Sequence, residues 1–215
     1  MSSGVADKIA CAKSMRIIAG TKRGMKLLGP KTTASRPITD RVKESLFNVL
    51  YKYDLPSGAV VADLFCGVGS LGLETLSRGA EFVTFVEQDA RTIAILKRNI
   101  EKAGFVKESK VIRANVFKIG APLVFDQQKY ALVFVDPPYA ATSSVEAGSA
   151  LGRLLDLLGE QVAGEGIVIV RTEQKTFLLD RYGEFQVIER RRWGTMMVTI
   201  LSKSGMEKDR KEFEI

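Results

Sequence analysis

The chain has 215 residues and a net charge of +7, and 46% of its residues are hydrophobic, so it can form one folded domain with a small appendage. It contains no histidine, which excludes Ser-His-Asp and Cys-His catalysis and HExxH zinc sites. Cys11 and Cys66 make no disulfide framework and, without histidine, no structural zinc site; this cysteine usage is typical of the reducing cytosol. No apolar run approaches the roughly 18 residues of a membrane span, and residues 1–14 lack the apolar core of a secretory signal.

Basic residues collect near the start of the chain. Residues 1–14 are small and polar without periodicity, so we expect a disordered extension there. Glycines and prolines interrupt residues 15–38, which predicts a hairpin or an irregular arm. Eight basic residues between Met15 and Lys43 stand against Asp40 alone, and three consecutive arginines follow at 190–192. Such local charge is typical of a surface that binds a polyanion, so we predict a nucleic-acid partner.

A helix is expected after this arm. Thr39 and Asp40 can both cap it, and Asp40 also suits the positive end of the helix dipole. Four apolar residues follow at helical spacing: Val42, Leu46, Val49 and Leu50. Arg41 and Lys43 fall off this stripe, so we expect the segment from Arg36 to Lys43 to hold phosphates.

From residue 59 onward, strand and helix patterns alternate. Strand patterns cover residues 60–65, 82–87, 110–114, 131–135, 166–171, 185–191 and 195–202. Helical patterns cover residues 71–77, the segment between Asp89 and Gly104, 144–159 and 173–181. The alternation predicts a parallel sheet with helices on both faces, and the last two strands predict an antiparallel hairpin that turns at Trp193 and Gly194.

A glycine-rich loop follows the first predicted strand. Residues 66–72 read CGVGSLG, a GxGxxG pattern that opens a helix. Gly67 and Gly69 allow a tight turn and let a ligand approach the helix N-terminus. Glu87 ends the second strand, where a carboxylate can accept both hydroxyls of an adenosine ribose. Loop and carboxylate together predict an adenosine-containing cofactor, without separating NAD from S-adenosylmethionine.

A second motif ends the fourth predicted strand, where Asp136, Pro137, Pro138 and Tyr139 follow an apolar run. The prolines lack backbone N–H groups and stop the strand. A carboxylate, a free carbonyl and an aromatic ring are therefore left at the carboxyl edge of the sheet, where open α/β sheets bind ligands. Two acceptors and a stacking ring suit a planar base that carries an exocyclic amine.

Three features favour S-adenosylmethionine over NAD. Asp63 stands just before the glycine loop, where it can meet the methionine ammonium. Asn115 follows the third strand and can contact the adenine amine. The turn at Asp136 lies beside the first strand in this topology, and hydride transfer has no use for it.

The turn at Asp136 resembles the signature of amino-methyltransferases that act on exocyclic or amide nitrogens. Three further blocks are similar to the RsmD family, whose members methylate a guanine N2 in bacterial 16S rRNA. They read MRIIAG at 15–20, RPITDRVKESLFN at 36–48 and DLFCGVGSLGLE at 63–74, and the Arg-Pro-x-Thr-Asp-Arg-Val portion is the most family-specific. Residues 1–14 lie outside the family pattern, and Asn115 stands where related enzymes often carry Asp.

The resemblance implies a Rossmann-like class I methyltransferase fold, an α/β architecture with a mostly parallel seven-stranded sheet, a C-terminal antiparallel hairpin and a small basic N-terminal extension. It implies methyl transfer from S-adenosylmethionine to guanine N2 of 16S rRNA, within the small ribosomal subunit or an assembly intermediate. We expect a cytoplasmic monomer with no metal. The expected parts are an extension at 1–14, an RNA-contacting arm and helix at 15–57, a methyltransferase domain at 58–203 and a charged tail at 204–215.

Each part of the expected site has named residues. The catalytic residues are Asp136, Pro137, Pro138 and Tyr139. The cofactor-binding residues are Asp63, Phe65, Gly67, Gly69, Glu87, Asn115 and Asp136. The RNA-binding residues are Arg16, Lys22, Arg23, Arg36, Thr39, Asp40 and Arg41. Trp193 is interpreted as a packing residue of the hairpin.

Four other functions stay open. The same motif serves adenine N6 in DNA or RNA and the amide of a protein glutamine, and only the amino-terminal block separates these substrates from guanine N2. An NAD-dependent oxidoreductase would fit the glycine loop but has no need of the turn at Asp136. A catalytically silent RNA-binding or assembly factor could use the same scaffold, although intact Asp136, Tyr139, Gly67, Gly69 and Glu87 argue against it.

Overall fold

The computed structural model describes residues 15–29, 38–126 and 128–203. Its strands are β1 (Val60–Leu64), β2 (Phe82–Glu87), β3 (Ser109–Arg113), β4 (Tyr130–Val135), β5 (Val162–Glu173), β6 (Arg181–Tyr182), β7 (Phe185–Trp193) and β8 (Met196–Lys203). Its helices are α1 (Asp40–Leu50), η1 (Tyr51–Tyr53), α2 (Ser70–Ser77), α3 (Ala90–Ala103), α4 (Val116–Ile119), η2 (Tyr139–Thr142) and α5 (Ala150–Gln161). No helix in these ranges is long and apolar enough to cross a membrane.

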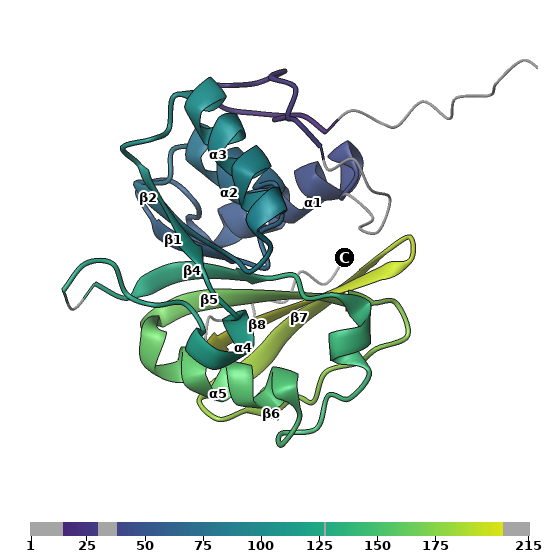
Figure 1. Cartoon of the computed structure of the whole chain (residues 1–215). Coiled ribbons are helices and arrows are strands. Elements are labelled where there is room, and N and C mark those ends of the chain that lie inside the picture. Colours follow the sequence, from purple (N-terminus) through teal and green to yellow (C-terminus); the bar gives the residue numbers. More distant parts are fainter. Residues whose placement is uncertain (1–14, 30–37, 127, 204–215) are drawn as a thin grey trace, which may run out of the picture.

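The eight strands form one sheet in the order β3-β2-β1-β4-β5-β8-β7-β6 (Figure 1). The pairs among β1 to β5 are all parallel. β8 runs antiparallel to β5, and β7 runs antiparallel to β8, which makes the C-terminal hairpin. The predicted fold class is therefore confirmed. The strand beyond the expected seven is β6, a two-residue edge strand paired with β7.

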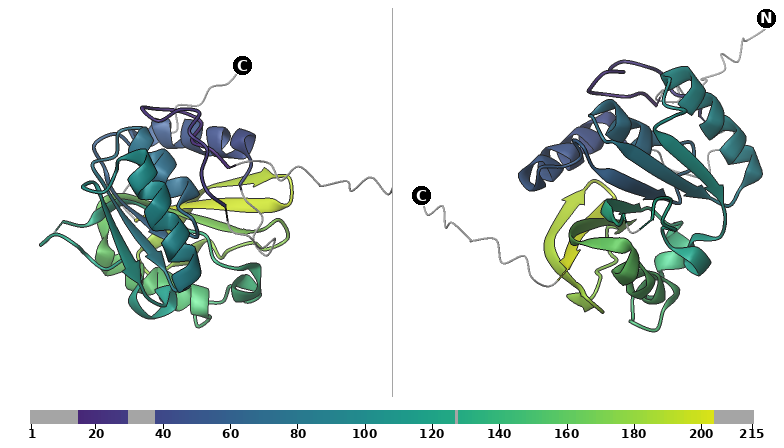
Figure 2. Two further views of the ribbon diagram at one scale, coloured as in Figure 1. Left: turned by 45° about the horizontal axis from the view of Figure 1, so that its top comes forward. Right: turned by 90° about the vertical axis from the view of Figure 1, so that its left-hand side faces the viewer.

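Helices cover both faces of the sheet. α1, α2 and α3 lie on one face, and α4 and α5 lie on the other, as the two views of Figure 2 show. Successive residues of β1 accordingly enter different apolar clusters: Val61 packs in the cluster with α1, α2 and α3, while Val60 and Ala62 pack in the cluster with α5. Since every residue of β1 is buried, the strand is apolar apart from Asp63.

The capping residues and the glycine stop in the sequence predicted several helix ends correctly. The Thr39 hydroxyl accepts a hydrogen bond from the N–H of Val42 and caps α1. The Asp89 carboxylate accepts from the N–H of Thr92 and caps α3. α3 ends at Gly104, which has a φ of +75°.

One predicted helix begins later than expected, and another is absent. Residues 144–149 are not helical, because the hydroxyl of Ser149 caps α5 by accepting from the N–H of Gly152, and α5 begins at Ala150. Residues 173–181 form no helix. β5 instead continues to Glu173, and the N–H of Gln174 then donates to the carbonyl of Thr195 in the hairpin turn. The pairing with β8 thus overrides the local helical pattern.

Lys43 belongs to the segment expected to hold phosphates, but its side chain does not reach the surface. Its side chain is 1% exposed, and its Nζ donates to the carbonyl of Arg16 at 2.8 Å and lies 3.5 Å from Oε2 of Glu74. Glu74 on α2 is fully buried and also pairs with Arg78 at 2.9 Å. Burial lowers the pKa of Lys43, and the Glu74 carboxylate opposes this change. Lys43 therefore neutralises a buried carboxylate and is not placed to hold a phosphate.

Candidate active site

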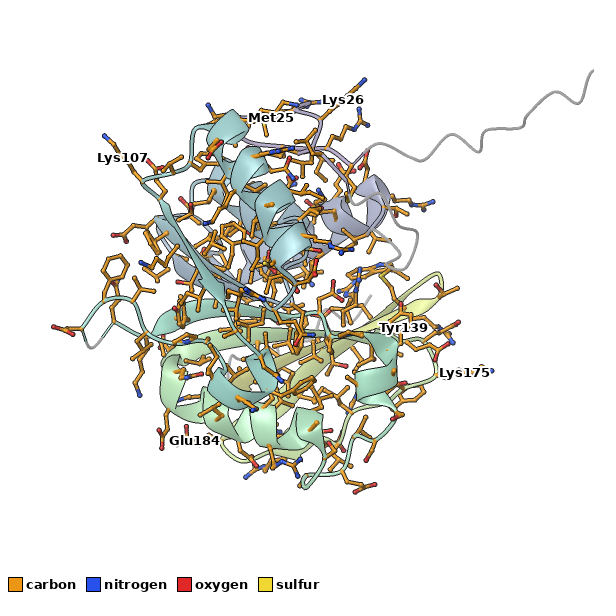
Figure 3. The ribbon with its side chains drawn as sticks, in the orientation of Figure 1. Met25, Lys26, Lys107, Tyr139, Lys175 and Glu184 are labelled. Carbon is orange, nitrogen blue, oxygen red and sulfur yellow. The ribbon has the colours of Figure 1, made fainter. Side chains whose placement is uncertain are left out.

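The candidate site lies where the central parallel strands end. Leu64 of β1 pairs in register with Val86 of β2 and with Val135 of β4, so these strands end side by side. The N–H of Asp136 donates to the carbonyl of Leu64 at 3.4 Å, which ties the turn after β4 to the end of β1. Figure 3 shows Tyr139 beyond the end of β4, on the side of the molecule where η2 lies. The loops after these strands therefore meet at one edge of the sheet.

Glu87 at the end of β2 holds the glycine loop in place. Its Oε2 accepts from the N–H of Gly67 at 3.1 Å. Its Oε1 accepts from the N–H groups of Gln88 and Asp89 at 2.8 and 2.9 Å. The predicted contact between Glu87 and a ribose would therefore use the remaining lone pairs of a carboxylate whose direction is already set.

Different constraints act on the two glycines of the loop, Gly67 and Gly69. Both have positive φ, +55° at Gly67 and +87° at Gly69, a conformation that other residues rarely adopt. A Cβ on Gly69 would lie 2.4 Å from Cδ1 of Leu96, so this position is closed by packing. A Cβ on Gly67 would meet nothing within 4 Å. The open side of the loop is therefore at Gly67, where a cofactor can approach the backbone.

Asp63 is buried under the glycine loop. Its side chain is 1% exposed, and its Oδ2 accepts from the N–H of Gly72 at 2.8 Å. Burial raises the pKa of Asp63 from 3.8 to about 7; the hydrogen bond from Gly72 opposes this change, and the neighbouring carboxylates of Asp136 and Glu87 contribute to it. A cationic ligand at this position would favour the ionised form again. Asp63 is thus suited to meet the ammonium of a bound amino-acid group.

Aromatic rings flank the loop on the side of β3. Phe65 follows β1 with a φ of +56°, an uncommon value for a residue other than glycine. Its ring lies 5.0 Å from the ring of Phe117 on α4. Asn115, predicted to contact adenine, caps α4 by accepting from the N–H of Phe117 at 3.0 Å. The sequence analysis does not include Phe117 among the site residues, although it stands only two residues after Asn115.

The turn after β4 contains the expected catalytic groups. Asp136 is partly exposed, Pro137 is buried and Pro138 is exposed, and Tyr139 begins η2 with a half-buried side chain. No donor in the described part of the chain reaches the carbonyl of Pro137. Burial raises the pKa of Asp136, and the nearby Arg171 guanidinium opposes this change. The turn therefore offers a carboxylate and an unused carbonyl side by side.

Arg171 is the charged neighbour of Asp136 that the sequence interpretation missed. It lies near the end of β5, and its Nε is 2.5 Å from Oδ1 of Asp136. The signal was a charged side chain at the carboxyl end of an otherwise apolar strand. The pairing itself joins residues 35 positions apart, so only the fold brings them together.

The predicted RNA-binding residues lie on the amino-terminal segment or at the start of α1. Arg16, Arg23 and Arg41 are exposed, and Nζ of Lys22 lies 5.7 Å from the ring centre of Phe105. Asp40 pairs with Arg16 at 2.7 Å, so its carboxylate orients an arginine. Thr39 is used as the cap of α1. Arg36 lies outside the described residues.

Two buried polar side chains join the amino-terminal segment to the glycine loop and to α2. The Asn99 amide nitrogen donates to the carbonyls of Leu28 and Val68 at 3.1 and 3.0 Å, and its oxygen accepts from the N–H of Leu28 at 2.8 Å. The Glu74 carboxylate accepts from the N–H groups of Ile18 and Ala19 at 2.8 and 3.0 Å. The basic segment is therefore fixed directly beside the glycine loop.

The sequence matches the model of a known protein family. The model of the family described as "Conserved hypothetical protein 95" matches residues 15–202. The chain belongs to this family. The resemblance to RsmD is thereby confirmed, since the family includes proteins of that name.

Members of the family and their structures match most of the chain. The chain is 31% identical to YlbH of Bacillus subtilis over 193 residues, which cover 89% of this chain and 100% of that protein. It is 34% identical over 163 residues to ribosomal RNA small subunit methyltransferase D of Escherichia coli, covering 74% of this chain and 75% of that protein. The solved structure of yhhF from Escherichia coli superimposes with a TM-score of 0.72 at 30% identity, covering 88% of this chain and 98% of that chain.

Proposed function

We propose that this chain transfers a methyl group from S-adenosylmethionine to the exocyclic N2 amine of a guanine in 16S rRNA of the small ribosomal subunit. The observation that carries the proposal is the turn after β4, where the carboxylate of Asp136 and the unused carbonyl of Pro137 lie next to the glycine loop. Family membership and the similarity to small subunit methyltransferase D support it. We place the protein in the cytoplasm as a monomer.

The residues around the glycine loop fit S-adenosylmethionine. The open side of Gly67 admits the cofactor to the backbone, and Glu87 stands where a ribose would offer its hydroxyls. Asp63 would pair with the ammonium, which compensates the cost of ionising a buried carboxyl. Phe65 and Phe117 offer apolar surface for adenine. The cofactor, when bound, supplies an electrophilic methyl group.

The chemistry required of the protein is to prepare a poor nucleophile. The lone pair of an aromatic amine is delocalised into the ring. Asp136 and the carbonyl of Pro137 accept its two N–H groups, which favours a pyramidal nitrogen with its lone pair directed at the methyl group. Tyr139 stacks on the base and holds it in line. Rate acceleration then comes from positioning and preorganised electrostatics, and Asp136 stabilises the cationic amine until its proton leaves.

The target base must leave its stack to reach this turn, since the acceptors stand at the end of a strand. Arg16, Arg23 and Arg41 are exposed on the side of the molecule that carries the arm, and we propose that they hold the RNA backbone. Because phosphate contacts release counterions, affinity for RNA should fall steeply as salt rises.

The test is methyl transfer from labelled S-adenosylmethionine to small ribosomal subunits from a strain that lacks the modification. Naked 16S RNA, DNA and protein extract serve as parallel substrates, and mass spectrometry identifies the modified nucleoside. N2-methylguanosine is the expected product. Label in N6-methyladenosine would contradict the proposed substrate but would still support methylation of an exocyclic amine. Cofactor binding without label in any nucleic acid would favour a protein glutamine or a silent assembly factor.

A further inference from the structure

The ion pair between Arg171 and Asp136 has no role in the chemistry described above. Val135 and Val170 pair in register between β4 and β5, so Asp136, which follows the end of β4, lies beside Arg171, which is still within β5. Nε of Arg171 lies 2.5 Å from Oδ1 of Asp136, and the two side chains are 15% and 19% exposed. The contact therefore uses one carboxylate oxygen and leaves Oδ2 without a donor among the described residues.

The surroundings of the pair are apolar on the side of α1. Asp136 and Arg171 line a small cavity with these residues: Ile38, Leu46, Leu71, Phe134, Val135, Ile169 and Val198. All seven are hydrophobic, so the cavity offers few polar groups that could form hydrogen bonds with Asp136 or Arg171 in place of their ion pair. A charge-assisted hydrogen bond is stronger and better oriented in such surroundings than in water.

We propose that Arg171 is a positioning residue for methyl transfer: its Nε holds Oδ1 of Asp136, so that Oδ2 and the carbonyl of Pro137 face the target amine. This inference rests on the proposed function. A carboxylate without such a partner can rotate about its side-chain torsions and present either oxygen. With Oδ1 occupied, the two acceptors left at the turn match the two N–H groups of an exocyclic amine.

The charge of Arg171 has a second consequence. The titratable groups around Asp136 are Asp63 on β1, Tyr139 on η2 and Arg171 on β5. Among the described residues, Arg171 is the cation that contacts Asp136, and Asp63 is a second carboxyl that interacts with it electrostatically. Burial raises the pKa of Asp136 and Arg171 lowers it. Loss of Arg171 should therefore leave less of Asp136 ionised at neutral pH, and the deficit should shrink as pH rises.

The experiment compares wild type with Arg171→Met and Arg171→Gln in methyl transfer to small subunits, across acidic to alkaline pH. Arg171→Lys keeps the charge but loses the planar guanidinium geometry. Arg181→Met is the matched control, since Arg181 is exposed on the edge strand β6. Turnover, KM for the subunit, cofactor affinity and thermal stability are measured for each variant.

Both neutral variants should lose turnover on the order of 10- to 100-fold at neutral pH, with KM and cofactor affinity close to wild type. The loss should diminish toward alkaline pH, and Arg171→Lys should lie between wild type and the neutral variants. Wild-type turnover and pH profile in Arg171→Gln would overturn the inference. So would a loss that is uniform across pH and follows the loss of thermal stability. An active wild type with unaffected variants refutes this inference alone, whereas a wild type that methylates no RNA refutes the proposed function.

Discussion

Asp63→Asn should stabilise the cofactor-free protein while weakening its binding of S-adenosylmethionine. Asp63 is 1% exposed, and burial raises its pKa from 3.8 to about 7. At about 1.4 kcal/mol per pH unit, this rise corresponds to a cost on the order of 4 kcal/mol when the carboxyl is ionised. Asparagine is neutral at every pH, and its side-chain oxygen can still accept from the N–H of Gly72.

The sign of the pH dependence follows from which state binds the proton. Between about pH 4 and about pH 7, the folded protein keeps a proton on Asp63 that the unfolded chain releases. Stability of wild type should therefore fall as pH rises through this window, and the full cost should be present above about pH 7. Asp63→Asn should remove that part of the slope and raise the free energy of unfolding at alkaline pH by up to about 4 kcal/mol.

The assay is urea unfolding of cofactor-free protein followed by circular dichroism at a series of pH values. Asp156→Asn is the control, because Asp156 is exposed on α5, on the other face of the sheet. Calorimetric titration measures the cofactor, and loss of a charged hydrogen bond of about 1.5–3 kcal/mol should weaken its binding roughly 10- to 100-fold. Equal stability of Asp63→Asn and wild type at every pH would refute the reasoning about burial. Unchanged cofactor affinity would refute the ammonium contact.

Five further substitutions, in three groups, follow from the structure. Lys43→Met removes one of the two cations that pair with buried Glu74, and should lower the free energy of unfolding by about 3–5 kcal/mol in urea titrations; a change near zero would contradict the buried pair. Gly69→Ala should destabilise the fold through its clash with Leu96 and through backbone strain, whereas Gly67→Ala should destabilise it less, through strain alone, and should weaken cofactor binding; thermal melts and calorimetry separate them, and the opposite pattern would contradict the open side at Gly67. Arg23→Gln and Arg41→Gln should each reduce the slope of log affinity for RNA against log salt by about one, and slopes equal to wild type would remove these residues from the interface.

What the sequence predicted well depends on contacts between near neighbours. The caps at Thr39 and Asp89 and the stop at Gly104 are formed by residues within four positions of their partners, so the residue types alone indicate them. The mostly apolar runs of β1 and β4 are equally local, because strands buried on both faces are built largely from apolar residues. The glycine loop and the turn at Asp136 then follow from their places after these strands.

What the sequence could not give depends on residues far apart in the chain. Lys43 is a basic residue in a basic cluster, and only the packing of α1 against α2 shows that it pairs with buried Glu74. Residues 173–181 have a helical pattern, and pairing of β5 with β8 prevents the helix. The contacts of Asn99 and Arg171 can be recognised only in the folded structure, where the amino-terminal segment and the turn after β4 lie beside them.

The central claim is that Asp136 prepares the target amine, and single-turnover methyl transfer by Asp136→Ala tests it most directly. Small subunits that lack the modification are the substrate, labelled S-adenosylmethionine is the donor, and cofactor affinity is measured on the same preparation by calorimetry. We predict a loss of transfer of at least about 100-fold with cofactor affinity close to wild type. Near-normal formation of N2-methylguanosine by Asp136→Ala would contradict the account.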